Sequence, residues 1–444
     1  MKKTINFVGV ISLVFLIAFV LGMVVSCNRA KEEAPAEMVS SGGKITLSKL
    51  ELLGKKIFFD DNLSTPPGQA CASCHDPSVG WSGPIEKFNK TGSVYEGALA
   101  GRFGNRKPPT AAYAGLSPVL HRNEEGDFVG GMFWNGRATG WKIGDPLAEQ
   151  AMVPFLNPLE HNNPDKKSVV LKIMESDYVD LFKEVWGEDA LSVADEEAIE
   201  KSYELIARSI AAFERSREVN PFSSKFDYFW RRAKEAGKDV TRINGKNWRE
   251  YLGLGLDEAE VEGLMIFVDK ALCVNCHVLD EGAHGEPPVF TDFTYDNLGV
   301  PRNPENPFYK QTAEFNPDGA KWIDKGLGGF LETTEKYAQY AQENYGKHKV
   351  PTLRNVDLRP SPDFVKAYLH NGFFKTLKEV VHFYNTRDVG DWPPPEVSEN
   401  VNRDEMGDLG LSEREEDLLV LFMKTLSDGF QPERSLKQSS GSEN

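Results

Sequence analysis

The stretch CASCH at residues 71–75 decides how this chain folds, and CVNCH at residues 273–277 repeats its pattern. In each stretch two cysteines stand three residues apart, and a histidine directly follows the second. Two thiols at this spacing can form thioethers with the two vinyl groups of one haem, and the adjacent imidazole then reaches the iron. The motifs therefore predict two covalently bound c-type haems, held through Cys71, Cys74 and His75 and through Cys273, Cys276 and His277.

Other uses of paired cysteines fit this pattern less well. A thioredoxin-like CxxC does not require the trailing histidine, and a zinc site built from two CxxC pairs would normally have the pairs closer together. The fifth cysteine, Cys27, stands alone. An odd number of cysteines does not suit a disulfide framework.

Composition limits the class of protein. The chain has 444 residues, of which 40% are hydrophobic and 27% charged. This length allows two or three domains or a duplicated module, and the composition excludes a largely disordered chain or a polytopic membrane protein. The net charge of -16 disfavours nucleic acid, which needs a basic footprint. It suits either a basic protein partner or simply a solvated acidic surface.

Residues 1–26 have the form of an export signal. Two lysines precede an apolar run from Phe7 to Val25, which ends just before Cys27. This arrangement resembles a bacterial lipoprotein processing site, whose cysteine is lipidated; an uncleaved anchor helix is the alternative. Both interpretations tether the chain to a bacterial membrane on its periplasmic side. The polar residues 27–45 predict a flexible tether.

The two halves of the chain repeat the same landmarks in the same order. After each motif come a Pro-Thr pair, an Asn-Gly pair and a Leu-x-Glu segment, which begin at residues 109, 135 and 147 and at residues 351, 371 and 377. This order indicates a duplicated haem module. We expect an N-terminal haem domain at 46–240, a C-terminal haem domain at 250–430 and a disordered tail at 431–444.

Helical periodicity dominates both halves. Apolar residues recur at helical spacing before the second motif, at Val261, Leu264, Val268 and Leu272. The same spacing marks Ile199, Tyr203, Ile206, Ile210 and Phe213. Alternating runs are few, so the fold class is mainly α, and the Pro-, Gly- and Asn-rich segment 281–350 is expected to be a long insertion or loop.

The repeat predicts that the two haem sites are unequal. Tyr384 stands seven residues after Leu377, and Pro154 stands seven residues after Leu147. If the two copies superpose, these residues lie at equivalent places over their haems. A phenolate can ligate iron and a proline cannot. One haem should therefore be six-coordinate, and the other should keep an open face where a small oxidant binds.

The distribution of other ligand types agrees with this prediction. No methionine lies between His277 and Met406, and no histidine follows the first motif until His121. The alternative role of Tyr384 is that of a packed core tyrosine. His382 is a rival ligand two residues away, but in a helix it would point to a different face.

Taken together, these residues resemble the bacterial diheme cytochrome c peroxidase family, and in particular its MauG-like branch. The resemblance covers roughly residues 46–430. Besides the haem motifs it includes FWNGRA at 133–138, EQA at 149–151, PFLNPLE at 154–160, PTLRNV at 351–356 and LKEVVHFY at 377–384. It implies two cytochrome c-like haem domains in tandem, with the active site on the N-terminal haem. It also suggests a homodimer.

The resemblance implies roles for the iron ligands. His75 would be the proximal ligand of the peroxidatic haem and His277 that of the second haem. Tyr384 matches the tyrosine ligand of the MauG-like branch, where ordinary members of the family carry methionine. The histidine that caps the first haem in many resting peroxidases has no counterpart, so activation by reduction is not expected.

The resemblance implies further roles around the first haem. Glu160 matches the distal glutamate that acts as acid and base, although its sequence context alone would suit a surface glutamate. Gln150 matches the distal glutamine, and Trp134 matches the tryptophan between the haems, for which simple core packing is the alternative. Arg354 could pair with a haem propionate, since a guanidinium suits a carboxylate, or with a surface acid.

Calcium finds little support in this sequence. The family's calcium site uses an asparagine where this chain has Lys107, within Arg-Lys-Pro-Pro at residues 106–109. The lysine ammonium would replace the ion. The later backbone ligands, near Val365 and Ala367, are a poor match.

Three functions stay open. The first is reduction of hydrogen peroxide at the N-terminal haem, with electrons delivered through the C-terminal haem from a small cytochrome c or a similar donor. The second is a MauG-like, peroxide-dependent oxidation of side chains on a partner protein. The third is a non-enzymatic diheme electron carrier, against which Glu160, Gln150 and the open site argue.

Overall fold

The computed structural model describes residues 45–432. The predicted lipoprotein signal, Cys27 and nearly all of the predicted tether lie outside the described residues, as does the tail beyond residue 432. The described chain is mainly helical, and its only named sheets are two short two-stranded ones, so the predicted fold class is confirmed. Between residues 45 and 432 no helix has the length and apolar content needed to cross a membrane.

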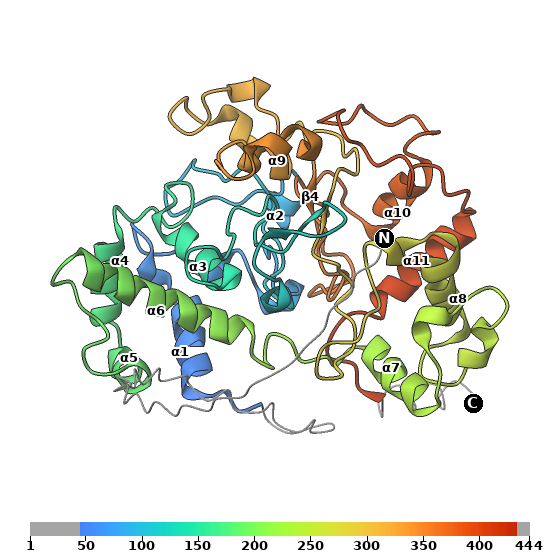
Figure 1. The fold of residues 1–444 in the computed structure, drawn as a ribbon, viewed down its shortest axis with the longest axis horizontal. Coiled ribbons are helices and arrows are strands. Elements are labelled where there is room, and N and C mark those ends of the chain that lie inside the picture. The colour runs from blue at the N-terminus through green and yellow to red at the C-terminus, as the bar shows by residue number, and fades with distance from the viewer. Residues whose placement is uncertain (1–44, 433–444) are drawn as a thin grey trace, which may run out of the picture. The chain divides into compact units, whose positions relative to one another are not determined.

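Residues 49–214 form the first group of helices, most of which stand on the left of Figure 1. A capping box between Ser48 and Glu51 starts the first of them. The predicted apolar face of residues 199–213 is buried throughout. The helices are α1 (Lys49–Phe58), α2 (Glu86–Asn89), α3 (Pro146–Leu156), α4 (Lys166–Met174), α5 (Val179–Trp186) and α6 (Glu196–Glu214).

Residues 225–424 form the second group, around the second motif. Its helices are α7 (Lys225–Glu235), α8 (Glu258–Met265), α10 (Leu377–Thr386) and α11 (Glu413–Lys424). Although α7 lies in the segment that we assigned to the N-terminal domain, its apolar residues pack into the second hydrophobic cluster. The domain limits at 240 and 250 remain predictions.

The same close crossing of two helices occurs in both groups. It explains why each group has a glycine at the point of contact. At Gly54 of α1 an added methyl group would lie 1.8 Å from the Ser209 carbonyl oxygen of α6. At Gly263 of α8 it would lie 2.1 Å from the Leu418 carbonyl oxygen of α11. Only glycine allows such close backbone contact. The shared crossing, visible for both pairs in Figure 1, is the structural form of the internal repeat.

The helix before the second motif ends earlier than the periodicity predicts. After α8 the chain makes one π-helical turn, Ile266–Lys270. Leu272, predicted on the buried helical face, instead adopts a left-handed conformation with φ 52° and is 47% exposed. The turn ends the helix so that a short 3-10 segment, Cys273–Asn275, carries the motif.

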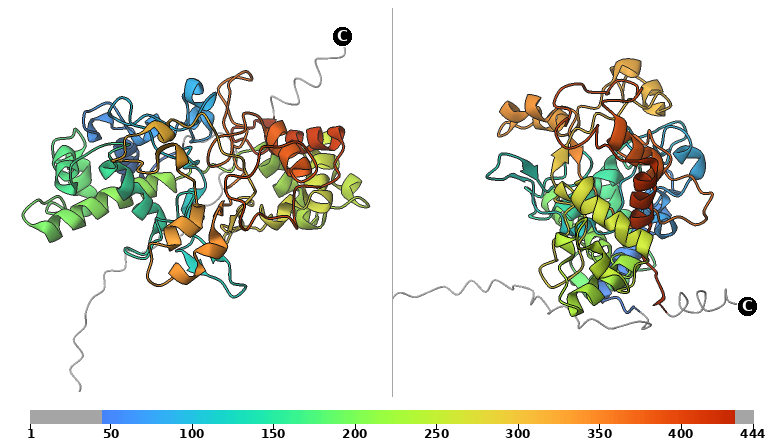
Figure 2. Two further views of the ribbon diagram at one scale, coloured as in Figure 1. Left: turned by 90° about the horizontal axis from the view of Figure 1, so that it is seen from above. Right: turned by 90° about the vertical axis from the view of Figure 1, so that its right-hand side faces the viewer.

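The segment 281–350 is ordered. It contributes β3 (Tyr295–Asp296), β4 (His348–Lys349) and α9 (Gly326–Leu331), while β1 (His121–Arg122) pairs with β2 (Phe128–Val129) in the first module. Leu120 and Phe128 pack with Tyr295, Leu327 and Leu331 in a third hydrophobic cluster. In Figures 1 and 2 the orange segment with α9 stands over the junction of the two groups of helices.

Candidate haem sites

The second motif lines a largely apolar cavity. Cys273, Cys276 and His277 lie in its wall, and Tyr384 of α10 also lines it. His277 Nδ1 is 2.9 Å from the Phe290 carbonyl oxygen, so in the neutral ring this nitrogen carries the proton. Nε2 then offers its lone pair, which is how a second contact prepares a histidine as a metal ligand.

Two rival ligands of the second site have different positions. The His382 side chain is half exposed on the other face of α10, where its Nδ1 lies 2.9 Å from Glu416 Oε1. It therefore points away from the cavity, as helical geometry predicted. Met406, distant in sequence from the motif, lines the cavity together with Tyr384. The sequence analysis did not identify Met406 as a candidate ligand, because it lies far from the motif along the chain.

The first motif lines a cavity of its own, called the first cavity below, which is more polar than the second cavity at the second motif. His75 repeats the arrangement of His277, with Nδ1 3.3 Å from the Trp81 carbonyl oxygen. Cys74 and His75 lie in the wall of this cavity, and Gln150 and Pro154 of α3 line it as well. At the helix position that Tyr384 fills in the second module, the first module has only the proline ring.

Glu160 also lines the first cavity, in the loop that follows α3. Asn157 Nδ2 donates to Glu160 Oε1 over 2.6 Å and orients the carboxyl group. Burial raises the pKa of this carboxyl, against the opposing influence of the Arg137 guanidinium and the Asn157 hydrogen bond. The arrangement provides a carboxyl group that can accept and return a proton beside an open space.

Trp134 separates the two cavities and lines both of them. Its indole Nε1 donates to the Lys107 carbonyl oxygen over 2.7 Å, which fixes the ring at the junction of the modules. Asp324, from the segment before α9, is a second residue that lines both cavities. No sequence motif pointed to this aspartate.

Lys107 does not provide a calcium ligand. Its buried ammonium donates to the Ser82 hydroxyl and the Pro108 carbonyl oxygen, each over 3.1 Å. Burial lowers the pKa of this ammonium to about 8, so it keeps its charge at neutral pH. Calcium needs several oxygen ligands, and a fixed cation at the position of one of them opposes its binding. The residues at this position do not fit the ion.

Arg354 does not occupy the place predicted for it. Its side chain is 1% exposed, and among the described residues it lines neither haem cavity. The guanidinium donates to both carboxylate oxygens of Asp227 over 2.7 and 2.8 Å and to the Pro288 carbonyl oxygen. The Arg354 guanidinium thus donates to Asp227 of α7 and to the Pro288 carbonyl oxygen. The structure does not support its pairing with a haem propionate.

The two cavities together fit c-type haem. Each joins a CxxC pair to an imidazole whose Nδ1 faces a carbonyl oxygen, and the thiols form no disulfide. The known proteins that this chain resembles agree. The sequence model of the di-haem cytochrome c peroxidase family matches residues 48–235. The methylamine utilization protein MauG of Paracoccus denitrificans is 31% identical over 394 residues, which cover 85% of this chain and 88% of that protein.

The chain belongs to the di-haem cytochrome c peroxidase family. Cytochrome-c peroxidase IdrP1 of Denitromonas iodatirespirans is 25% identical over 404 residues, or 88% of this chain and 85% of that protein. The diheme peroxidase BthA of Burkholderia thailandensis shares the fold with a TM-score of 0.66 and 26% identity, over 86% of this chain and 87% of that one.

Membership of this di-haem family establishes the general chemistry. The protein is an oxidoreductase of the haem peroxidase type, it carries two c-type haems, and its activity depends on peroxide. His75 and His277, with the cysteines beside them, are the residues that would hold these haems. When bound, the haems supply iron centres that exchange single electrons.

Proposed function

We propose that this protein reduces hydrogen peroxide at the first haem site, with electrons that enter at the second haem site from a small cytochrome c or a similar donor. One observation carries the proposal: Glu160 and Gln150 line the first cavity beside Pro154, whereas the corresponding helix of the second module places Tyr384 in its cavity. Acid–base groups are thus found where the module leaves space for a small oxidant.

The residues of the first cavity would act on the two oxygen atoms of the peroxide. Glu160 accepts a proton from one oxygen and returns it to the other, so that the leaving group is water. Gln150 orients the peroxide by hydrogen bonding. The overall reaction takes two electrons and two protons for each peroxide and yields two molecules of water.

A second candidate function follows from Tyr384. Burial raises the pKa of its phenol, so only a strongly charged partner such as ferric iron would remove the proton. An anionic phenolate ligand stabilises oxidised iron and lowers its potential, which makes the second haem a poor acceptor for electrons from a high-potential cytochrome. This favours the chemistry of the MauG-like branch, in which a side chain of a partner protein is oxidised.

Stopped-flow mixing of the holoenzyme with hydrogen peroxide, with and without reduced cytochrome c, separates these functions. Fast oxidation of the cytochrome is the result expected of a peroxidase. A long-lived oxidised species that does not react with cytochrome c identifies the enzyme as a modifier of proteins. If peroxide leaves both haem spectra unchanged, both proposals fail and a simple electron carrier remains.

We also propose that a lipid on Cys27 tethers the enzyme to the periplasmic face of a bacterial membrane. The support is the apolar run that ends directly before this cysteine. Replacement Cys27→Ala should abolish incorporation of a radiolabelled fatty acid. Continued labelling of the variant would overturn the assignment.

A further inference from the structure

A tight turn of identical form occurs once in each module. Residues 132–138 and residues 368–374 each close through an antiparallel bridge, between Met132 and Ala138 and between Tyr368 and Phe374. In both turns the second and fifth residues have positive φ, at Phe133 (63°), Gly136 (74°), Leu369 (63°) and Gly372 (63°). The third residue is Trp134 in the first turn and His370 in the second. These two side chains are therefore counterparts in the internal repeat.

The two counterparts meet at the junction of the modules. The rings of Trp134 and His370 pack edge to face, with centroids 6.4 Å apart and planes at 66°. Lys107 connects the turns through its backbone, since its carbonyl accepts from Trp134 Nε1 and its N–H donates to the His370 carbonyl oxygen over 2.8 Å. Trp134 lines both cavities, and His370 lines the second.

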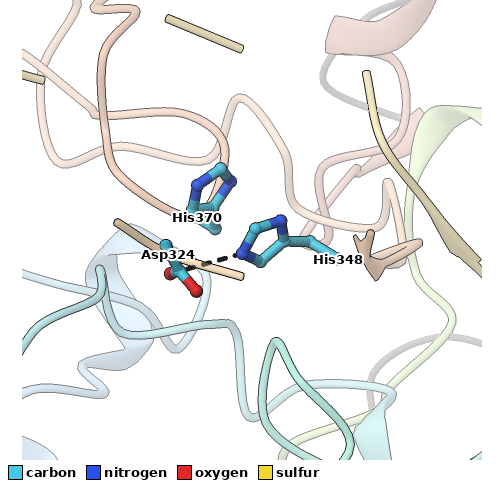
Figure 3. A group of neighbouring side chains, drawn as sticks. All are labelled: Asp324, His348 and His370. Carbon is cyan, nitrogen blue, oxygen red and sulfur yellow. Dashed lines mark ion pairs between the residues drawn. The ribbon is translucent and has the colours of Figure 1, made fainter. Parts of the chain in front are cut away.

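One face of the His370 ring is covered by a second imidazole. His348 lies parallel to it, with centroids 3.5 Å apart and planes at 8°. The carbonyl oxygen of Gly346 lies 3.0 Å from His348 Nδ1, and Oδ2 of Asp324 lies 3.3 Å from Nε2 (Figure 3). His348 is therefore held at Nδ1 by the Gly346 carbonyl oxygen, while its Nε2 lies within ion-pair distance of Asp324.

Asp324 is itself held in place. Arg106 donates to its two carboxylate oxygens over 2.7 and 2.6 Å, and the Gly326 N–H donates over 3.0 Å. Asp324 is 3% exposed and His370 is 6% exposed. A buried chain of contacts thus runs from Arg106 through Asp324 and His348 to His370 and ends at the Trp134 indole.

This cluster is not arranged as a metal site. The lone pairs of an imidazole lie in the plane of its ring, and two parallel rings 3.5 Å apart do not direct them to one point. Arg106 already occupies both oxygens of the only carboxylate in the group. Instead, the stacking with His348 fixes the plane of the His370 ring against Trp134.

We propose that His370 is a positioning residue for electron transfer: it holds the Trp134 indole in the orientation in which an electron crosses between the two haem sites. His348 and Asp324 support His370 in this role. The inference rests on the proposed function, in which electrons pass from the second site to the first. In each crossing one electron would leave the haem held by His277 and reach the haem held by His75, so that the first of these is oxidised and the other reduced by one electron. No bond forms, no proton moves, and two crossings serve each peroxide.

The test measures the crossing without peroxide. Holoenzyme with both haems ferric is reduced by less than one electron in a short radiolytic pulse, and the redistribution of that electron between the haems is followed by absorbance. His370→Leu removes the ring, and His370→Phe keeps a ring of similar outline as the matched control. The rate of electron transfer depends on the distance and orientation of the aromatic ring between the two sites. We therefore expect redistribution to slow severalfold in His370→Leu and to stay near the wild-type rate in His370→Phe.

Two further readouts separate this role from a merely structural one. The midpoint potentials and absorption spectra of both haems should be unchanged in His370→Leu. If that variant does not incorporate haem, His348→Leu, which removes only the supporting ring, should slow the redistribution instead. The inference is overturned if His370→Leu or His348→Leu, loaded with both haems, redistributes the electron at the wild-type rate. It is also overturned if His370→Phe slows the redistribution as much as His370→Leu does. Because no peroxide is used, a wild-type enzyme that fails to reduce peroxide would contradict the proposed function and leave this result intact.

Discussion

Pro154 and Tyr384 occupy the same position in two copies of one helix. Each stands in the last turns of its helix, α3 or α10, and each lines the cavity of its own module. Glu149 and Glu379, five residues earlier in both copies, accept backbone N–H groups of the loop before the helix. Glu149 holds the loop at Gly140 and Lys142, Glu379 caps its helix at Lys375 and Thr376, and the residue five positions later faces the cavity in both copies.

Replacing the phenol should open the second site. In Tyr384→Phe we expect the second haem to lose its low-spin ferric spectrum, because a phenyl ring has no ligand atom. Met406→Leu is the matched control, since Met406 lines the same cavity and could also offer a ligand. Electron paramagnetic resonance of the oxidised proteins measures the change. A low-spin second haem in Tyr384→Phe that becomes high-spin in Met406→Leu would identify methionine as the ligand.

Removing the carboxyl group should slow the chemistry at the first site. Glu160→Gln preserves shape but cannot accept a proton, and general acid–base groups contribute about 100- to 10,000-fold to rate. We expect the rate of peroxide reduction to fall within that range while both haem spectra persist. Glu175→Gln, at an exposed glutamate just after α4, is the control. Full turnover by Glu160→Gln would remove the residue from the mechanism.

The pH dependence of the first site has a defined sign. Because burial raises the pKa of Glu160 above its ordinary value of 4.5, the carboxylate form that accepts a proton is lost as pH falls through this raised pKa. The rate of reaction with peroxide should therefore rise with pH along a limb that lies above pH 4.5. Arg137 lowers the pKa of Glu160, so Arg137→Gln should move the limb to higher pH. Stopped-flow rates across pH test this, and movement to lower pH would contradict it.

Removal of calcium should have no effect on this enzyme. The Lys107 ammonium already binds the oxygens of Ser82 and Pro108, so chelation with EGTA should leave Tm and peroxide turnover unchanged. Lys107→Asn replaces the charge by an oxygen ligand, and the Tm of that variant is expected to rise with added calcium. A wild-type Tm that falls with EGTA and recovers with calcium would show that the lysine does not replace the ion.

Local sequence patterns predicted the parts of the site that depend on local geometry. The haem motifs, the fully buried face of α6 and the Pro154–Tyr384 contrast follow from short spacings and from the order of the repeat. Those features need no knowledge of which segments meet in space. Leu272 was placed wrongly because periodicity does not reveal the π-helical turn that ends α8.

The remaining parts depend on contacts between distant segments. Asp324 lies before α9, His348 lies in β4 and His370 lies in the turn 368–374, and no sequence pattern brings these three segments together. Arg354 was expected to pair with a haem propionate or with a surface acid, and its partner is instead the buried Asp227 of α7, a segment that the sequence assigned to the other module. Met406 likewise reaches the second cavity through the fold and not through proximity along the chain.

The central claim is that the two haem sites are unequal, with the first open to peroxide and the second closed by a protein ligand. Electron paramagnetic resonance of the ferric holoenzyme, before and after one equivalent of hydrogen peroxide, tests it most directly. We expect one high-spin and one low-spin ferric signal, and loss of the high-spin signal on addition of peroxide. Two low-spin signals that peroxide does not alter would contradict it.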